Sequence, residues 1–235
     1  MDLLARLAED PSRAALFLDI DGVLAPIVSR PEDARVPDET RAELRRLVAR
    51  YALVACISGR AGADAERLVG VPGVVYVGNH GLERSPDAPA WTARLRAFLE
   101  QVDWPSLEDK GLTAALHYRG VADENAAVAH LEQIAASAHG EGFRTRFGRK
   151  VLEILPPIDA DKGTAVRALL AEGGLARALY AGDDTTDLDG FRALDGLEIA
   201  VRVAVAPPES PEELRTKADI VVASPAEALE LFRRL

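Results

Sequence analysis

Two aspartates at the end of a short apolar run are the residues of this sequence best suited to chemistry. Asp19 and Asp21 follow the apolar stretch 14–18, and Gly22 comes directly after them. The stretch is too short for a helix and lacks polar alternation, so it predicts a strand buried on both faces. Ligands of open α/β sheets bind where such strands end. A simple turn would explain Asp21, but it leaves Asp19 unexplained, because a buried acid needs a partner or a metal.

A second acidic strand end lies far along the chain. Asp183 and Asp184 follow the apolar run 178–181, and Asp187 comes three residues later. Right-handed crossovers would bring this strand end to the same sheet edge as Asp19. Crowded carboxylates repel one another unless a cation joins them, and hard oxygen ligands select Mg²⁺ or Ca²⁺. N-capping of the next helix is the alternative for Asp184 and Asp187, although it does not account for Asp183.

Lys162 and Ser58 are candidates for binding an anion. Lys162 stands at the predicted start of a helix, where the helix dipole disfavours a cation unless an anion such as a phosphate or Asp19 lies nearby. Ser58 and Arg60 follow the apolar run 52–57, and a hydroxyl with free amides at a helix start suits a phosphate. A simple cap is the alternative for Ser58.

Cys56 has to be considered as a nucleophile, because some phosphatases use a cysteine. Their loop requires an arginine six positions later, and that position is Gly62. We therefore predict that Cys56 is a small core residue.

The rhythm of predicted elements divides the chain. Runs at 14–18, 52–57 and 74–77 each end in a polar turn with glycine, which indicates βα units of one parallel sheet. The same rhythm returns after Asp161, with strands at 178–181, 199–205 and 219–223 and helices at 164–171, from about 186, and at 225–235.

The intervening stretch predicts a different architecture. Residues 85–90 have the composition of a linker, and they precede a helix, a strand at 112–118, a helix at 124–138 and a hairpin of 143–147 with 151–155. Strand pairs without crossover helices indicate an α+β unit. We predict an α/β core formed by 1–86 and 158–235, with 87–157 inserted as an α+β domain and the candidate site at their junction.

Polar residues of the inserted stretch form a possible binding surface. His117 and Arg119 are two apart in a predicted strand and would face the same side. A solvated sheet face explains such a cluster equally well, whereas opposite an acidic metal site it would suit a phosphorylated substrate. The residues are Lys110, His117, Arg119, Arg149, Lys150 and Glu153.

Composition limits the partners. The 235 residues carry a net charge of -10 with a pI near 5.0, which argues against nucleic acid or an anionic membrane as a partner. Residues 1–10 lack a secretory signal, no run approaches the roughly 20 apolar residues of a membrane span, and one cysteine suits a reducing compartment. We expect a cytoplasmic protein, and a monomer.

The motifs resemble those of the haloacid dehalogenase superfamily and, within it, the trehalose-6-phosphate phosphatases. The four superfamily motifs occur in order, at 19–22, Ser58, Lys162 and 182–187. The closer resemblance lies in 24–27, 57–60, 79–83, 117–119, 150 with 153, and 182–187, so it covers nearly the whole chain and includes the insert as the family's cap. Val23, Leu188 and Gly190 depart from the usual Thr, Glu and Ala, which bears on packing and rate.

The resemblance implies a role for each motif residue. Asp19 would be the nucleophile and Asp21 the acid and base, while Ser58 and Lys162 would hold the phosphoryl oxygens. Mg²⁺ would be bound by Asp19, the Asp21 main-chain carbonyl and Asp183, with Asp184 and Asp187 supporting it. The residues implied at the sugar are Arg60, His80, Glu83, Lys110, His117, Arg119, Lys150 and Glu153.

The predicted function is therefore Mg²⁺-dependent hydrolysis of trehalose 6-phosphate through an aspartyl-phosphate. Three alternatives stay open: a phosphatase for another sugar phosphate such as sucrose 6-phosphate, a phosphomutase, and a phosphosugar-binding regulator without turnover.

Overall fold

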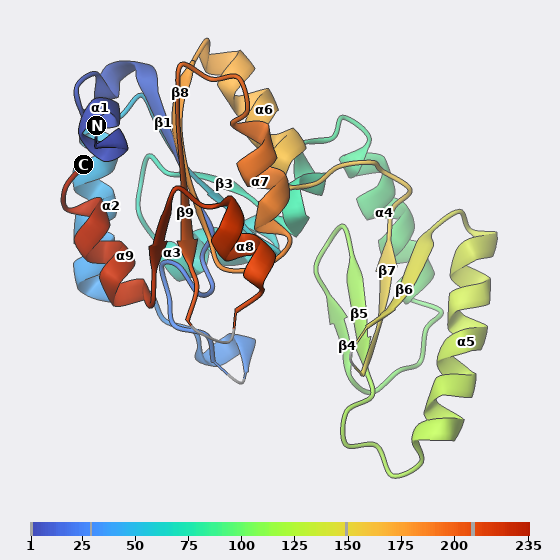
Figure 1. The fold of residues 1–235 in the computed structure, drawn as a ribbon. Coiled ribbons are helices and arrows are strands. Elements are labelled where there is room, and N and C mark those ends of the chain that lie inside the picture. Colours follow the sequence, from blue (N-terminus) through green and yellow to red (C-terminus); the bar gives the residue numbers. More distant parts are fainter. Residues whose placement is uncertain (1, 29, 149, 208–209) are drawn as a thin grey trace. The chain divides into compact units, whose positions relative to one another are not determined.

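The chain forms two compact units (Figure 1). The computed structural model describes residues 2–28, 30–148, 150–207 and 210–235, so Arg149 lies outside the described residues. One unit, here called the core, consists of Met1–Gly81 with Ala160–Leu235, and the other, the cap, is Leu82–Asp159. Among the described residues, no helix combines the length and the apolar character that crossing a membrane requires.

The core contains a six-stranded parallel sheet in the order β10-β9-β8-β1-β2-β3. Its strands are β1 (Ala14–Leu18), β2 (Leu53–Ile57), β3 (Val75–Val77), β8 (Arg177–Gly182), β9 (Ile199–Val205) and β10 (Ile220–Val222). The predicted strands are thus confirmed, with small changes at their ends. The chain moves away from β1 in both directions, so the neighbours β1 and β8 form the topological switch point, where ligands of such sheets bind.

Helices cover both faces of the core sheet. Their bounds are α1 (Leu3–Ala8), α2 (Asp38–Arg50), α3 (Gly62–Val69), α6 (Lys162–Gly173), α7 (Asp187–Ala193), α8 (Glu212–Lys217) and α9 (Pro225–Phe232). Residues of α1, α2, α3 and α9 pack into one apolar cluster, and residues of α6, α7 and α8 pack into the other.

Strand β1 is central because both of its faces are apolar. Leu16 and Leu18 contribute to one cluster and Phe17 to the other, and none of these side chains is exposed. Such a strand needs helices on both sides of the sheet. Its carboxyl end is therefore surrounded by the carboxyl ends of β8 and β2, and this arrangement positions the candidate site.

The cap contains a four-stranded antiparallel sheet in the order β4-β5-β7-β6. Its elements are α4 (Ala88–Leu99), β4 (Leu107–Asp109), β5 (Ala114–His117), α5 (Glu124–Gly140), β6 (Arg144–Gly148) and β7 (Val151–Leu155). Leu116, Leu152 and Ile154 point to the side on which Leu95 of α4 and Leu131 of α5 complete an apolar cluster. The α+β character of the insert is therefore confirmed.

The predicted linker 85–90 is partly wrong. Helix α4 already begins at Ala88, and Pro89 lies in its first turn. Proline is tolerated there because the first helical amides have no intrahelical partner.

Candidate functional site

Asp19 is the first residue after β1, and its side chain is 9% exposed. Its amide donates a hydrogen bond to the Ala181 carbonyl of β8 over 2.9 Å, which extends the parallel pairing by one residue. Its Oδ1 accepts from the Ile20 amide at 2.7 Å and its Oδ2 from Lys162 Nζ at 2.7 Å. Burial raises the pKa of Asp19 to about 7, although the Lys162 charge acts to lower it. The Asp19 carboxylate is therefore buried, and the two hydrogen bonds to its oxygens fix its orientation.

Lys162 begins α6 and is only 2% exposed. Its Nζ donates to Asp19 Oδ2 and to Asp187 Oδ1, both at 2.7 Å. Burial opposes the charge of Lys162, but these two carboxylates raise the pKa of the amine overall. The prediction that an anion lies beside this helix start is confirmed, because Asp19 and Asp187 supply it.

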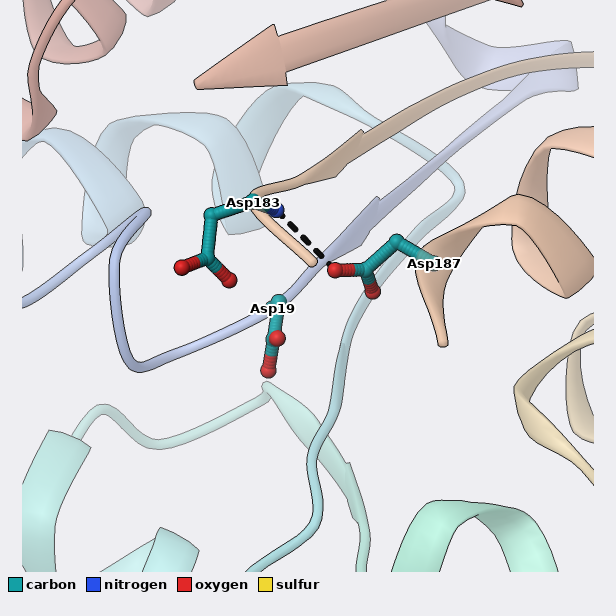
Figure 2. A group of neighbouring side chains, drawn as sticks. All are labelled: Asp19, Asp183 and Asp187. Atoms are coloured by element: carbon teal, nitrogen blue, oxygen red, sulfur yellow. Dashed lines mark hydrogen bonds between the residues drawn. The ribbon is translucent and has the colours of Figure 1, made fainter. Parts of the chain in front are cut away.

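Asp187 organises the strand end that carries Asp183 (Figure 2). Its Oδ1 accepts from Lys162 and, at 2.8 Å, from the Tyr180 hydroxyl. Its Oδ2 accepts from the Asp183 amide at 2.9 Å, which is the bond drawn in Figure 2, and from the Asp184 amide at 3.0 Å. The side chain is fully buried. Its four hydrogen bonds compensate a charge that burial would otherwise make costly. Asp187 is therefore much more than a simple helix cap.

Tyr180 was missed by the sequence analysis. A buried tyrosine hydroxyl usually has a hydrogen-bond partner, so a Tyr within the apolar strand two residues before Gly182 was the available signal. Burial raises the pKa of this hydroxyl, and the nearby Asp187 charge adds to the effect. Tyr180 thus stays a donor to Asp187.

The side chain of Asp183 packs directly against Gly22. A Cβ on Gly22 would lie 2.1 Å from Asp183 Oδ2, which is too close for two non-bonded atoms. Gly22 also has φ of +78°, a backbone conformation that residues with a side chain rarely adopt. Among the described residues, none donates a hydrogen bond to the Asp183 carboxylate. Burial, followed by the charges of Asp19 and Asp187, raises the pKa of Asp183 to about 8. The structure therefore leaves one half-buried carboxylate uncompensated.

The site fits a hard divalent cation. Asp19, Asp183 and Asp187 each offer one carboxylate oxygen, and these three oxygens lie within 4.8 Å of one another. A cation would compensate the repulsion that raises the pKa of Asp183. Each oxygen of Asp187 accepts two hydrogen bonds, whereas each oxygen of Asp19 accepts one. Asp19 and Asp183 are therefore the better ligands, and Asp187 supports them. Asp184 lies outside this group, with its exposed side chain accepting hydrogen bonds from Thr185.

We expect Mg²⁺ to stabilise the fold more at pH 8 than at pH 5. The raised pKa values of Asp19 and Asp183 mean that the folded chain holds these protons more tightly than the unfolded chain. Their contribution to stability is complete below about pH 4 and is lost as the pH rises through 7 to 8. Mg²⁺ binds the ionised carboxylates and would restore stability there. Thermal unfolding with Mg²⁺ or a chelator measures this effect.

The matched control for this prediction is Asp183→Asn, which removes one ligand. We expect it to reduce the Mg²⁺ shift at pH 8, because only Asp19 of the two titrating ligands remains. Equal shifts at both pH values in the unaltered protein would contradict the assignment of the cation site.

Asp21 and Arg60 form a bidentate ion pair. Arg60 Nε lies 2.7 Å from Asp21 Oδ2, and Nη2 lies 2.8 Å from Oδ1. Asp21 is half-buried, and its side chain is not part of the acidic group around Asp183. Sequence analysis had placed Arg60 at the sugar, whereas the observed partner of its guanidinium is the predicted acid and base.

Ser58 and the following loop lie beside this pair. Ser58 is 1% exposed and its Oγ accepts from the Arg60 amide at 3.2 Å. It does not cap α3, because the N-cap of that helix is Ala61 and none of the described side chains caps it. The amide of Asn79 donates to the Arg60 carbonyl, and that of His80 to the Ser58 carbonyl. His80 is exposed, and a Cβ on Gly59 would lie 2.6 Å from its ring.

The three departures from the family pattern have packing explanations. Val23 and Leu188 are buried in the two apolar clusters of the core. A Cβ on Gly190 would lie 2.3 Å from Tyr180 Cε2. Gly190 thus makes room for the ring whose hydroxyl binds Asp187.

Gly190→Ala is expected to lower the free energy of unfolding by about 1–3 kcal/mol, the usual cost of overpacking a core. Urea unfolding measures it. Gly140→Ala is the matched control, because nothing lies within 4 Å of the added Cβ there. Equal stability of the two variants would show that the Tyr180 ring is not tightly packed.

The cap residues predicted at the sugar lie in two places. His117 and Glu153 are on the sheet face that the helices do not cover, where His117 Nε2 lies 3.1 Å from Glu108 Oε2 and Arg146 Nε donates to Glu153. Lys110 Nζ lies 3.7 Å from the same Glu108 oxygen.

Lys150 and Arg119 lie elsewhere in the cap. Lys150 forms an ion pair with Glu124 and lies over the Tyr118 ring. Arg119 follows the end of β5, so strand alternation does not place it with His117. Glu83 is exposed in a short helical segment before α4.

Cys56 is confirmed as a core residue. It is fully buried in β2, and burial raises the pKa of its thiol. An unreactive thiol is expected in such surroundings.

Two curated relatives are similar to this chain over almost its whole length. The "Probable trehalose-phosphate phosphatase 2" of Oryza sativa subsp. japonica is 30% identical over 95% of this chain and 68% of its own length. The "Trehalose-phosphate phosphatase" of Mycobacterium avium is 33% identical over 94% of this chain, which spans 61% of that relative.

Solved structures share the fold. Aspergillus fumigatus trehalose-6-phosphate phosphatase in crystal form 3 matches with a TM-score of 0.62 and 26% identity, covering 99% of this chain and 96% of that one. A haloacid dehalogenase-like hydrolase from Bacteroides thetaiotaomicron matches with a TM-score of 0.60 and 14% identity, covering 94% and 98%. The sequence profile described as trehalose-phosphatase matches residues 17–225. This chain belongs to the trehalose-phosphatase family, which consists of phosphoric monoester hydrolases with the haloacid dehalogenase fold.

Proposed function

We propose that this protein hydrolyses trehalose 6-phosphate to trehalose and phosphate in a Mg²⁺-dependent reaction through an aspartyl-phosphate. The observation that carries the proposal is the position of Asp19, at the end of β1 with Lys162 on one oxygen and Asp183 nearby. Similarity to relatives named as trehalose-phosphate phosphatases supports the choice of substrate.

Asp19 is the proposed nucleophile. In the first step an Asp19 carboxylate oxygen forms a bond to phosphorus, and the bond from phosphorus to the sugar oxygen breaks. Asp21 gives a proton to that leaving oxygen. The hydrogen bonds from Lys162 and from the Ile20 amide support this role, because they fix the carboxylate before the substrate arrives.

Water completes the second step. Asp21 accepts a proton from the water molecule as its oxygen bonds to phosphorus, and the bond between phosphorus and Asp19 breaks. Free phosphate and the Asp19 carboxylate are the products. One residue therefore serves first as acid and then as base.

Mg²⁺ held by Asp19, Asp183 and the Asp21 main-chain carbonyl would supply charge neutralisation, so that an anionic carboxylate can approach an anionic phosphate. Asp187 would support Asp183 by accepting the hydrogen bond of the Asp183 backbone amide. The exposed Asp184 would add negative charge near the cation. Lys162 and Ser58 would hold phosphoryl oxygens. The proposed reaction thus uses each polar group at this strand end.

The sugar is proposed to be recognised by polar groups outside that cluster. The proposed residues are His80, Glu83, Lys110, His117, Arg119, Lys150 and Glu153. Arg60 was predicted with them, but its pair with Asp21 supports a different role. We further propose that the enzyme is a cytoplasmic monomer, for which a single buried cysteine and the acidic net charge are the available support.

Phosphate release from three substrates tests the proposal. Trehalose 6-phosphate, glucose 6-phosphate and sucrose 6-phosphate are compared with Mg²⁺ and with a chelator. We expect selective, Mg²⁺-dependent release from the first. Equal release from all three would favour a broad sugar phosphatase, and binding without release would favour a regulator.

A further inference from the structure

The ion pair between Arg60 and Asp21 joins two strand ends of the core. Arg60 follows β2 and Asp21 follows β1, 39 residues apart in sequence. Both oxygens of the carboxylate accept from the guanidinium, at 2.7 and 2.8 Å. Such fork-to-fork pairing fixes the orientation of a carboxylate as well as its place.

Arg60 is itself held firmly. Its amide donates to Ser58 Oγ, its carbonyl accepts from the Asn79 amide, and its Nη1 donates to the Pro31 carbonyl at 3.2 Å. Asn79 has φ of +50° and His80 has φ of +54°, which non-glycine residues rarely adopt. The amides of these two residues donate to the carbonyls of Arg60 and Ser58, so this turn is tied to the loop that carries Arg60.

We infer that Arg60 is a positioning residue for Asp21. The inference rests on the proposed function, in which Asp21 transfers the proton. Proton transfer requires the carboxyl group within hydrogen-bond reach of the sugar oxygen and later of the water. Asp21 is half-buried in a turn closed by the bond from the Gly22 amide to the Ala25 carbonyl. The guanidinium is the side-chain group observed to hold the Asp21 oxygens.

A role at the sugar would give different kinetics. Losing a sugar contact that is made equally in the bound and transition states raises KM and leaves kcat unchanged, whereas misplacing the acid that transfers the proton lowers kcat. Positioning through Asp21 also predicts non-additivity, because removing Arg60 can cost nothing further once the Asp21 carboxylate is gone.

The test is a double-mutant cycle of Arg60→Ala and Asp21→Ala. Trehalose 6-phosphate is assayed together with p-nitrophenyl phosphate, which carries no sugar and needs little help from an acid to lose its leaving group. We expect Arg60→Ala to lower kcat for trehalose 6-phosphate by about 10- to 100-fold, with KM changed less than about threefold. In the Asp21→Ala background, we expect Arg60→Ala to change kcat for p-nitrophenyl phosphate less than about twofold.

Two further variants complete the design. Arg60→Lys keeps the charge but not the fork, so its kcat should lie between those of Arg60→Ala and the unaltered protein. Arg41→Ala is the control for losing a partly buried arginine. Arg41 is 26% exposed compared with 19% for Arg60, and it pairs with Asp38 and two carbonyls away from the site. It should leave kcat and KM unchanged.

The outcomes separate the two claims. If Asp21→Ala is impaired and the double variant loses the product of the two single losses in kcat, the positioning role alone is overturned. A raised KM of Arg60→Ala for trehalose 6-phosphate at unchanged kcat would overturn it as well. Full activity of Asp21→Ala would overturn both that role and the proposed proton transfer. Because p-nitrophenyl phosphate reports the cycle without a sugar, a wrong substrate assignment would not obscure the result.

Discussion

Asp19→Asn should lower kcat for phosphate release by at least about 10⁴-fold, the scale on which enzymes lose rate when a nucleophile is removed. The amide matches the carboxylate in shape but cannot attack phosphorus. Lys162 keeps its bond to Asp187 in this variant, so the fold should be retained. Steady-state kinetics together with circular dichroism measure the two expectations.

Asp195→Asn is the matched control, since this carboxylate pairs with Arg202 on the surface of the core. It should retain full activity. If Asp19→Asn turned over at a rate near that of this control, another group would have to be the nucleophile.

Lys162→Met should lower the free energy of unfolding by about 3–5 kcal/mol, the typical cost of leaving buried charges without their partner. Two buried carboxylates, Asp19 and Asp187, lose the amine that lies 2.7 Å from each. Activity should fall as well, because the same amine fixes the proposed nucleophile. Urea unfolding at pH 8 measures the stability change.

The pH dependence of that loss is a second readout. Burial raises the pKa of Asp19 to about 7 even beside Lys162, so at pH 5 Asp19 is protonated with or without the amine and carries no charge for it to neutralise. The destabilisation should therefore be smaller at pH 5 than at pH 8. Lys217→Met, an exposed change on α8, is the control. A loss below about 1 kcal/mol at both pH values would show that the network is not held by Lys162.

Much of the fold followed from local patterns in the sequence. The run 14–18 is apolar at every position, so it predicts a strand that is buried on both faces. Strand β1 has those bounds. The order of predicted elements also distinguished the two parts of the chain, because the core alternates strands with helices and the insert contains a hairpin. The short helices α1 and α8 were not predicted, because six residues give too few turns for a clear helical period. Only the start of α3 was expected, after Arg60.

The site was predictable where it depended on strand ends and not where it depended on side-chain direction. Topology brings Asp19 and Asp183 together, and their chemistry predicts a cation. The pair of Asp21 with Arg60 and the four bonds of Asp187 join residues through rotamers that no spacing rule specifies. Tyr180 escaped notice because its ring suits a buried strand whether or not its hydroxyl has a role.

Gly190 is a second position whose role depends on side-chain packing that the sequence does not specify. Its difference from the family pattern was visible in the sequence, but its reason was not. Only the distance from its absent Cβ to the Tyr180 ring explains why a glycine stands there.

The central claim is that Asp19 carries the phosphoryl group during turnover, and its most direct test is capture of that intermediate. Asp21→Asn, which should slow the attack of water, is mixed with Mg²⁺ and p-nitrophenyl phosphate, whose leaving group needs little help from the Asp21 proton. The mixture is quenched in acid, digested and analysed by mass spectrometry. We expect phosphate on Asp19 in the Asp21→Asn variant, and no phosphorylated residue in the double variant that also carries Asp19→Asn. Phosphate on another residue, or phosphate release by an enzyme that never becomes phosphorylated, would contradict it.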